Sequence, residues 1–331
     1  MRPAEGVRRA MIRRRLCLGA AAVALSLPLA GCVTVHGERA LIASARPAEA
    51  AKALADFAAA NNAATRTYDP ARVTATEAGP LGAIDEAGVR ARHVNNPSGN
   101  PSATPLVFSG TKYLIPRQRG WPKFFVADTA TNRGTARWLL VFRRSGPEQA
   151  WKADFLAVYA PGSLPAPATD KDGHAEAVPL AGSDLLVQPG QLSAAYAGYL
   201  QDGAGAQSFA PGAVTSQLRA SRAKESHTPS SVTQYQDQPV QGGEFDPVAL
   251  RTKNGGALVF FGTRHQSRAT YRPGYRLTLD PSTRALMSGT PRTSVTLSRM
   301  AQHVAFVPGG GGTGQVVILS RLVGLVSAKG A

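Results

Sequence analysis

Cysteine is nearly absent from this chain, whose 331 residues include only Cys17 and Cys32. Both lie near its beginning, so the rest of the chain contains neither a free thiol nor a disulfide. Stability therefore has to come from a hydrophobic core, and the length suffices for one large domain or two of ordinary size. Beyond Cys32, no apolar run approaches the roughly 20 residues that a membrane-spanning helix needs.

Histidine is also scarce, and the six histidines are scattered without an HxH or HxxxH pair. Because no cysteine lies near them, they predict no metal site. The segment Asp170–His174 begins like a calcium-binding loop. It lacks the glycine at the sixth position and the closing glutamate that such a loop needs, so we expect a polar turn.

Signatures of catalysis and of phosphate binding are missing as well. The glycine run Gly309–Gly314 is followed by Gln315–Leu319, which is typical of a strand. A phosphate loop needs a helix at that point, so the run predicts a connection between two strands. The chain has no Gly-x-Ser-x-Gly elbow either. We therefore predict no catalytic residue, no cofactor and no metal.

The beginning of the chain has the composition of a bacterial secretion signal. Five arginines lie within Arg8–Arg15, and the apolar stretch Leu16–Ala30 is too short to span a membrane. The sequence Leu29-Ala30-Gly31-Cys32 resembles a lipobox. We expect residues 1–31 to be removed and Cys32 to carry a diacylglyceryl group, whose two acyl chains give stable anchoring at the extracytoplasmic face of the membrane.

Three alternatives stay open for this leader. An uncleaved signal anchor is disfavoured by Pro28 and by the small residues before Cys32. The segment Arg13–Cys17 is loosely similar to a twin-arginine signal, so export by the Sec or by the twin-arginine route remains open. Either Met1 or Met11 can be the true start, because a complete signal also follows Met11.

Positive charge is the strongest compositional bias. The formal net charge is +16, and about +11 remains without the leader. The basic residues form three groups: Arg117, Arg119 and Lys123; Arg137, Arg143 and Arg144; Arg264, Arg268, Arg272 and Arg276. Because we expect an exported protein, nucleic acid is excluded as a partner. An envelope protein, an anionic wall polymer or anionic lipid is the expected partner, and a merely solubilising charged surface is the alternative.

The chain after the leader divides into two similar halves. We predict a spacer over 32–47, a first α+β domain over 48–160, a Pro/Gly-rich linker over 161–190 and a second α+β domain over 191–331. Each half begins with a helical pattern and continues with strands. Each also has an Asn-Gly-type turn between apolar runs, Asn132–Gly134 and Asn254–Gly256, which predicts a hairpin. The repeated order of helix and strands favours a duplication.

The layout predicts an α+β fold with two tandem cones, in each of which a curved antiparallel sheet wraps a helix. The chain resembles actinobacterial lipoproteins of uncharacterised function with tandem domains similar to the nuclear-transport-factor-two-like or cystatin-like superfamily. The residues that carry this resemblance are the lipobox, Asn61–Ala63, Glu77–Leu81, Ile115–Arg117, Trp121–Phe125 and Gly255–Phe261. This superfamily includes enzymes, ligand carriers and interaction modules, so the resemblance alone does not choose a function.

One carboxylate qualifies as a general base if the resemblance extends to the enzymes, which use an acidic residue inside the cone. This is Asp154, in the apolar run Trp151–Tyr159. Strand alternation places Ala153 and Phe155 on one face and Lys152 and Asp154 on the other, so we expect Asp154 to face solvent. Asp85 and Glu86 are likewise expected on the surface.

The sequence therefore predicts a membrane-anchored, non-catalytic binding or scaffold module of the cell envelope. The alternative is a small-ligand carrier or an enzyme that uses a cone interior. Plugging of the cones by Trp138, Phe142 and Phe260 would exclude that alternative.

Overall fold

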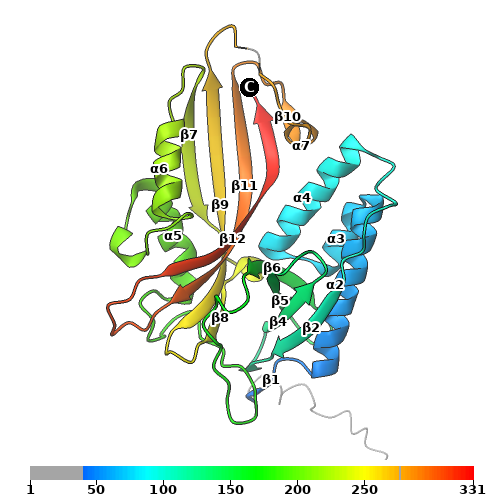
Figure 1. Cartoon of the computed structure of the whole chain (residues 1–331), viewed down its shortest axis with the longest axis vertical. Coiled ribbons are helices and arrows are strands. Elements are labelled where there is room, and N and C mark those ends of the chain that lie inside the picture. Colours follow the sequence, from blue (N-terminus) through cyan, green and yellow to red (C-terminus); the bar gives the residue numbers. More distant parts are fainter. Residues whose placement is uncertain (1–39, 276) are drawn as a thin grey trace, which may run out of the picture.

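The computed structural model describes residues 40–275 and 277–331. The predicted signal peptide, Cys32 with the rest of the lipobox, and the first half of the spacer (32–39) lie outside the described residues. The fold is α+β with curved, unclosed sheets, as predicted (Figure 1).

The first half has helices followed by an antiparallel meander. The helices are α2 (Pro47–Thr67), α3 (Pro70–Thr76) and α4 (Gly79–Asn95). The strands, in sheet order, are β2 (Phe108–Leu114), β4 (Lys123–Thr131), β5 (Arg137–Arg144) and β6 (Lys152–Tyr159). A separate two-residue pair joins β1 (Ile42–Ala43) to β3 (Arg117–Gln118). Proline within the first turn begins all three helices, where its missing N–H costs nothing.

The second half repeats this order with a longer sheet. Its helices are α5 (Leu192–Asp202), α6 (Ser216–Glu225) and the short α7 (Pro281–Ala285). Single 3-10 turns occur at η1 (Pro189–Gln191), η2 (Ala206–Ser208) and η3 (Gly243–Phe245). The sheet order is β10 (Met287–Gly289), β12 (Val317–Gly330), β11 (Ser294–Val307), β9 (Ala257–Tyr271) and β7 (Ser231–Pro239), and β8 (Val248–Arg251) also pairs with β9.

Both predicted hairpins are confirmed. Strands β4 and β5 pair antiparallel across Asn132–Gly134, and β8 and β9 pair antiparallel across Asn254–Gly256. The glycine run Gly309–Gly314 joins the antiparallel strands β11 and β12, as expected for a connection between strands. The segment Asp170–His174 is a turn, in which the Asp170 carboxylate accepts hydrogen bonds from the N–H groups of Asp172 and His174.

The space between α2 and the small sheet is filled by aromatic rings. Phe125 and Phe142 stack with centroids 4.9 Å apart, and Trp151 meets the edge of Phe125 at the same distance. Phe57 from α2 approaches Phe142 at 6.1 Å. Phe57, Phe125 and Phe142 are all buried. This interior is thus a packed core. Phe142 fills it, which is the arrangement that would exclude a ligand or substrate there.

The two sheets also share a core of their own. The faces turned away from the main helices meet through Val126, Val141 and Phe155 of the small sheet and Leu258 and Phe260 of the large one. Burial of this seam requires both halves, because each contributes one wall. Phe260 therefore fills the seam between the sheets.

Helix α4 closes the same seam from the side, between the two parts of the molecule in Figure 1. Two glycines permit its approach. A Cβ on Gly324 of β12 would lie 2.4 Å from Ile84, and one on Gly262 of β9 would lie 2.8 Å from Pro80. Any side chain at either position would therefore push α4 away from the sheet.

Residues 161–190 run along both halves without a helix or strand of their own, apart from the first residues of η1. Ala175 N–H donates to Ile115 O in the first half, and Val178 N–H donates to Ala249 O in the second. Leu185 forms a bridge to Gly309. The segment therefore ties the two sheets together along the seam.

Candidate functional site

Asp154 is buried, and the prediction that it faces solvent is wrong. Its exposure is 1%, and the register of β6 against β5 shifts at this residue: Val141 pairs with Phe155, but Phe142 pairs with Ala153. The extra residue is a β-bulge, which breaks the alternation on which the prediction depended. Ala153 consequently joins the aromatic core under α2, whereas Phe155 joins the seam.

Within the seam, Asp154 forms an ion pair with Arg143. Arg143 Nε lies 2.6 Å from Asp154 Oδ2, and Arg143 itself is only 5% exposed. The same guanidinium donates through Nη1 to Gly243 O at 2.6 Å and through Nη2 to Asp246 O. Burial raises the pKa of Asp154 to about 7, although the charge of Arg143 opposes the shift. The pair therefore joins the first sheet to η3 and the residue after it.

Arg143 also lies on the wall of the main cavity of the seam, which has a volume of about 380 Å³. Ten of the lining residues are apolar or proline: Leu41, Pro122, Phe124, Ala177, Val178, Pro179, Leu180, Pro247, Val248 and Ala249. Four are basic, Arg117, Arg119, Lys123 and Arg143, and one is acidic, Asp246. We call this cavity the seam pocket. Its chemistry is that of an apolar slot with a cationic rim.

Lys123 gives the seam pocket a buried positive charge. It is 3% exposed, its Nζ donates to Gln118 O at 3.1 Å, and it lies 5.4 Å from the centroid of Trp121. Among the described residues no carboxylate forms an ion pair with it. Burial, with a smaller contribution from Arg144, lowers the pKa of Lys123. A buried ammonium without a carboxylate is costly, and an anionic ligand would relieve that cost.

The other basic residues that the sequence grouped are used in different ways. Arg117 is paired with Asp170 at 3.3 Å and with Asp172 at 2.8 Å, whereas Arg119 is exposed at the pocket rim. Arg137 is paired with Asp128 at 2.7 Å. Arg144 lies between Trp121 and Trp151, with centroid distances of 5.1 and 4.8 Å. Arg264 and Arg268 are exposed on β9.

Asp85 contradicts the expectation of a surface position. It is half-buried and lies beside Glu77, which is 2% exposed at the end of α3. Burial, reinforced by the neighbouring Asp85, raises the pKa of Glu77 to about 9. At neutral pH Glu77 is therefore protonated. Glu86 is partly exposed and pairs with Arg90 at 3.5 Å.

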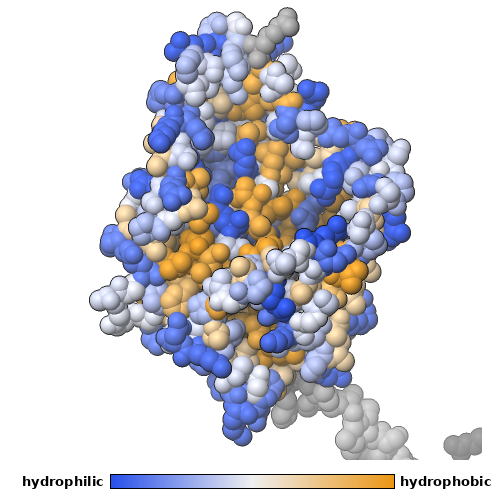
Figure 2. All heavy atoms as spheres, viewed as in Figure 1, coloured by the Kyte–Doolittle hydropathy of each residue, from blue (hydrophilic) through white to orange (hydrophobic). Residues whose placement is uncertain are grey.

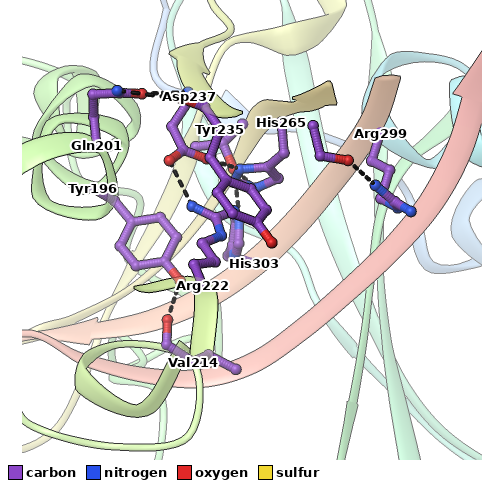
Figure 3. Close-up of polar contacts among 11 residues, drawn as sticks. Tyr196, Gln201, Val214, Arg222, Tyr235, Asp237, His265, Arg299 and His303 are labelled. Carbon is purple, nitrogen blue, oxygen red and sulfur yellow. Dashed lines mark hydrogen bonds and ion pairs between the residues drawn. The ribbon is translucent and has the colours of Figure 1, made fainter. Parts of the chain in front are cut away.

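A second buried polar cluster, which the sequence did not reveal, lies between α5, α6 and the large sheet (Figure 3). His265 Nδ1 lies 2.5 Å from Asp237 Oδ1, and His265 Nε2 lies 2.9 Å from Thr263 Oγ1. The same hydroxyl lies 2.8 Å from His303 Nε2. Arg222 from α6 pairs with Asp237 at 2.6 Å.

The order Asp237, His265, Thr263 is that of a nucleophile triad, but Thr263 is 0% exposed and bonded to two imidazoles. No substrate can reach its hydroxyl in this arrangement. Burial lowers the pKa of His303 well below its usual value, and Tyr196 and Phe261 pack against its ring. The cluster is therefore a closed, neutral-histidine network that fixes α6 to the sheet.

Sequence patterns missed both clusters because their members come from distant strands. Asp237, His265 and Thr263 lie on β7 and β9, which are neighbours only after folding. The one available signal was a polar residue inside an apolar strand, which Thr263, His265 and His303 all satisfy. No group of three potential metal ligands occurs among the described residues.

Comparisons with known proteins place the chain in a family. Residues 45–330 match the family described as "Domain of unknown function (DUF8094)". "Uncharacterized lipoprotein SCO2278" of Streptomyces coelicolor is 46% identical over 315 residues, which cover 95% of this chain and 94% of that protein. An "Uncharacterized lipoprotein" of Streptomyces avermitilis is 43% identical over 94% of this chain and 93% of its own length.

"Uncharacterized lipoprotein SCO6871" of Streptomyces coelicolor is 26% identical over 96% of this chain and 94% of its own length. No solved structure matches the chain. Among the helices that the structure describes, none is long and apolar enough to cross a membrane. With relatives that it covers almost end to end, this chain belongs to the family described as "Domain of unknown function (DUF8094)" and is, like them, a membrane-anchored lipoprotein.

Proposed function

We propose that this lipoprotein is a non-catalytic binding module, tethered through Cys32 to the extracytoplasmic face of the membrane, that holds an anionic amphiphile in the seam pocket. The ligand chemistry is a phosphate-type headgroup on an apolar chain. The observation that carries the proposal is Lys123, a buried cation that forms no ion pair with a carboxylate of the described residues, on the wall of a largely apolar cavity with further basic residues.

The composition of the pocket supports this ligand class. Phe124, Val178 and Val248 offer apolar contact to a chain, and Arg119 at the rim adds a second cation for the headgroup. A volume of about 380 Å³ falls within the range of about 300–1,000 Å³ that is usual for ligand sites. A fully hydrophilic anion would leave the apolar walls uncovered, and a neutral lipid would leave Lys123 uncompensated.

The predicted anchor keeps this pocket close to the membrane. Leu41 lines the pocket and lies nine residues after Cys32. At about 3.3 Å per extended residue, the intervening chain reaches about 30 Å at most. A lipid-anchored pocket therefore samples the headgroup region repeatedly, which favours an amphiphile from the membrane as its ligand.

Binding is preferred to catalysis because the two carboxylate sites are committed to structure. Asp154 is paired with Arg143, and Glu77 is buried and protonated beside Asp85. The interior under α2 is closed by Phe57, which leaves no room there for a substrate.

The proposal is tested with the lipoprotein in nanodiscs of neutral phosphatidylcholine. Dodecyl phosphate is added as the anionic probe, dodecanol as its neutral counterpart and inorganic phosphate as a headgroup without a chain. We expect dodecyl phosphate to raise the melting temperature most. Lys123→Met should weaken its binding about tenfold, which corresponds to about 1.4 kcal/mol.

Lys253→Met, at an exposed lysine, is the matched control and should bind like the parent protein. Equal binding of dodecanol, or unchanged binding by a folded Lys123→Met variant, would overturn the proposal. Nanodiscs with phosphatidylglycerol in place of the added probe separate a membrane lipid from a free amphiphile. If the lipid is the source, it should stabilise the parent protein more than the Lys123→Met variant.

The anchor is tested separately by cell fractionation. Cys32→Ala removes the lipidated sulfur, so the protein should leave the membrane fraction. Retention of this variant in membranes would show that Cys32 is not the anchor.

A further inference from the structure

A second cavity lies on the far side of the large sheet, away from the seam. It has a volume of about 280 Å³. One wall is the loop Ala210–Thr215 before α6, and the other is the first part of β12, Val317–Arg321. Figure 2 shows hydrophobic surface gathered on this side of the molecule, where Figure 1 draws the first part of β12. We call this cavity the β12 pocket.

The loop wall is held in place by the protein itself. Ala210 N–H donates to Val316 O at 2.9 Å, and the Thr215 hydroxyl donates to Ala210 O at 2.8 Å. The Tyr196 hydroxyl donates to Val214 O (Figure 3). The pocket is therefore preformed, so a ligand need not order the loop when it binds.

Arg321 supplies the only charge among the residues that line the β12 pocket. Its Nε is buried and has no hydrogen-bond partner, and no carboxylate of the described residues forms an ion pair with it. It pairs across the sheet with His303, which is a member of the polar cluster labelled in Figure 3. Burial lowers the pKa of Arg321. A partly buried guanidinium of this kind needs an anion to complete its hydrogen bonds.

The protein does not provide that anion nearby. The carboxylate of the cluster, Asp237, already accepts from Arg222 at 2.6 Å and from His265 at 2.5 Å. Arg299 donates to the Ser267 hydroxyl at 3.1 Å, and Figure 3 shows it directed away from Asp237. Of these three arginines only Arg222 pairs with Asp237, so Arg299 and Arg321 leave this side of the sheet with excess positive charge.

We propose that the β12 pocket binds a small organic carboxylate. The carboxylate pairs with the Arg321 guanidinium, and the apolar body of the ligand packs between Val214 and Ile318. The guanidinium fork matches a planar carboxylate, and the apolar walls select against small hydrated anions such as phosphate. The volume lies just below the usual range for drug-sized ligands, about 300–1,000 Å³, so the body is small.

The test uses the lipoprotein in neutral nanodiscs, with benzoate as the probe and benzamide as its uncharged counterpart. Isothermal titration should show that benzoate binds and that benzamide and inorganic phosphate bind at least about tenfold more weakly. Arg321→Gln should weaken benzoate binding at least about tenfold, whereas Arg268→Gln, at an exposed arginine of β9, should leave it unchanged.

A second variant guards against a folding defect in Arg321→Gln. Ala213→Phe changes an exposed loop residue and fills the pocket without touching Arg321, so it should also abolish benzoate binding. Benzoate binding that survives both variants would overturn the proposal, as would equal binding of benzamide or phosphate. Lys123→Met should retain benzoate binding, and Arg321→Gln should retain dodecyl phosphate binding, so failure at one pocket is distinguishable from failure at the other.

Discussion

The two halves of this molecule both begin with helices and continue with strands, but among the described residues only the second half adds a buried histidine network to the apolar core between helix and sheet. Under α2 the filling is aromatic, with Phe57, Phe125 and Phe142 in mutual contact. Under α5 and α6 Asp237 and His303 belong to a hydrogen-bonded network. The first interior is held by apolar packing, whereas the second combines its own apolar core, which includes Tyr196 and Phe261, with a network that depends on the protonation states of its members.

The difference extends to the response of each half to pH. In the first half burial raises the pKa of Glu77 to about 9, so this group stabilises the fold while it is protonated. In the second half His265 and His303 are stable when neutral. The first half therefore loses stability toward alkali, and the second loses stability toward acid.

The largest effect is expected from a substitution in the aromatic core under α2. Phe142→Ala leaves a cavity among rings that cannot close in, so the free energy of unfolding should fall by about 3–5 kcal/mol. Urea denaturation measures this loss. Val107→Ala, at a residue 54% exposed, is the control and should change stability little. A loss below about 1 kcal/mol for Phe142→Ala would contradict a rigid core there.

Part of the fold, including the aromatic core of the first half, could be predicted from the sequence. Apolar periodicity and Asn-Gly turns predicted the first helix of each half and both hairpins, because these signals are local. Of the residues named as plugs, Phe142 fills the interior under α2, whereas Phe260 is buried in the seam between the sheets instead of in a cone. What local signals cannot give is the bulge at Asp154, since one extra residue reverses every later side chain and depends on the pairing with β5.

The pockets and polar clusters were not predictable for a related reason. Lys123 and Val248 are far apart in the chain and become walls of one cavity only when the sheets meet. The basic groups in the sequence include residues that line the seam pocket, but only the fold distinguishes the buried Lys123 from exposed neighbours such as Arg119. Asp237 and His265 meet only through the register of β7 with β9.

The second prediction concerns the loss of stability of the first half as the pH rises. The pKa of Glu77 is about 9 in the folded chain against a usual value of 4.5. The unfolded chain therefore releases this proton at a lower pH than the folded chain does. Stability from this group is complete below pH 4.5 and declines as the pH rises toward 9, by about 1.4 kcal/mol per pH unit. Glu77→Gln removes the titration and should flatten this decline in thermal melts recorded across that range.

Glu86→Gln, on the more exposed side of α4, is the matched control and should leave the decline in place. A parent protein whose stability is flat between pH 5 and 9 would refute the protonated Glu77–Asp85 pair.

The third and smallest expected effect is the loss of stability of the second half as the pH falls. The pKa values of His265 and His303 are lowered by burial, so the unfolded chain takes up protons near pH 6.5 that the folded chain refuses. Stability from each histidine is present above pH 6.5 and is lost as the pH falls, by about 1.4 kcal/mol per pH unit. His303→Phe, which preserves the ring stack on Phe261, should roughly halve this acid slope in denaturant titrations.

His227→Phe, at an exposed histidine outside this cluster, serves as the control and should keep the full acid slope. An unchanged slope in His303→Phe would mean that the network contains a charged His303.

The shared core of the two sheets has a consequence for the folding process. One wall of the seam begins near Leu114, and the opposite wall is complete only with Val304 and Leu319, close to the end of the chain. The last strand β12 then clamps α4 at Gly324. Contacts that span most of the sequence are slow to form, because the chain loses loop-closure entropy before these contacts stabilise it. The apolar faces of the first sheet therefore stay open to water until nearly the whole polypeptide is present, and the two halves fold as one cooperative unit.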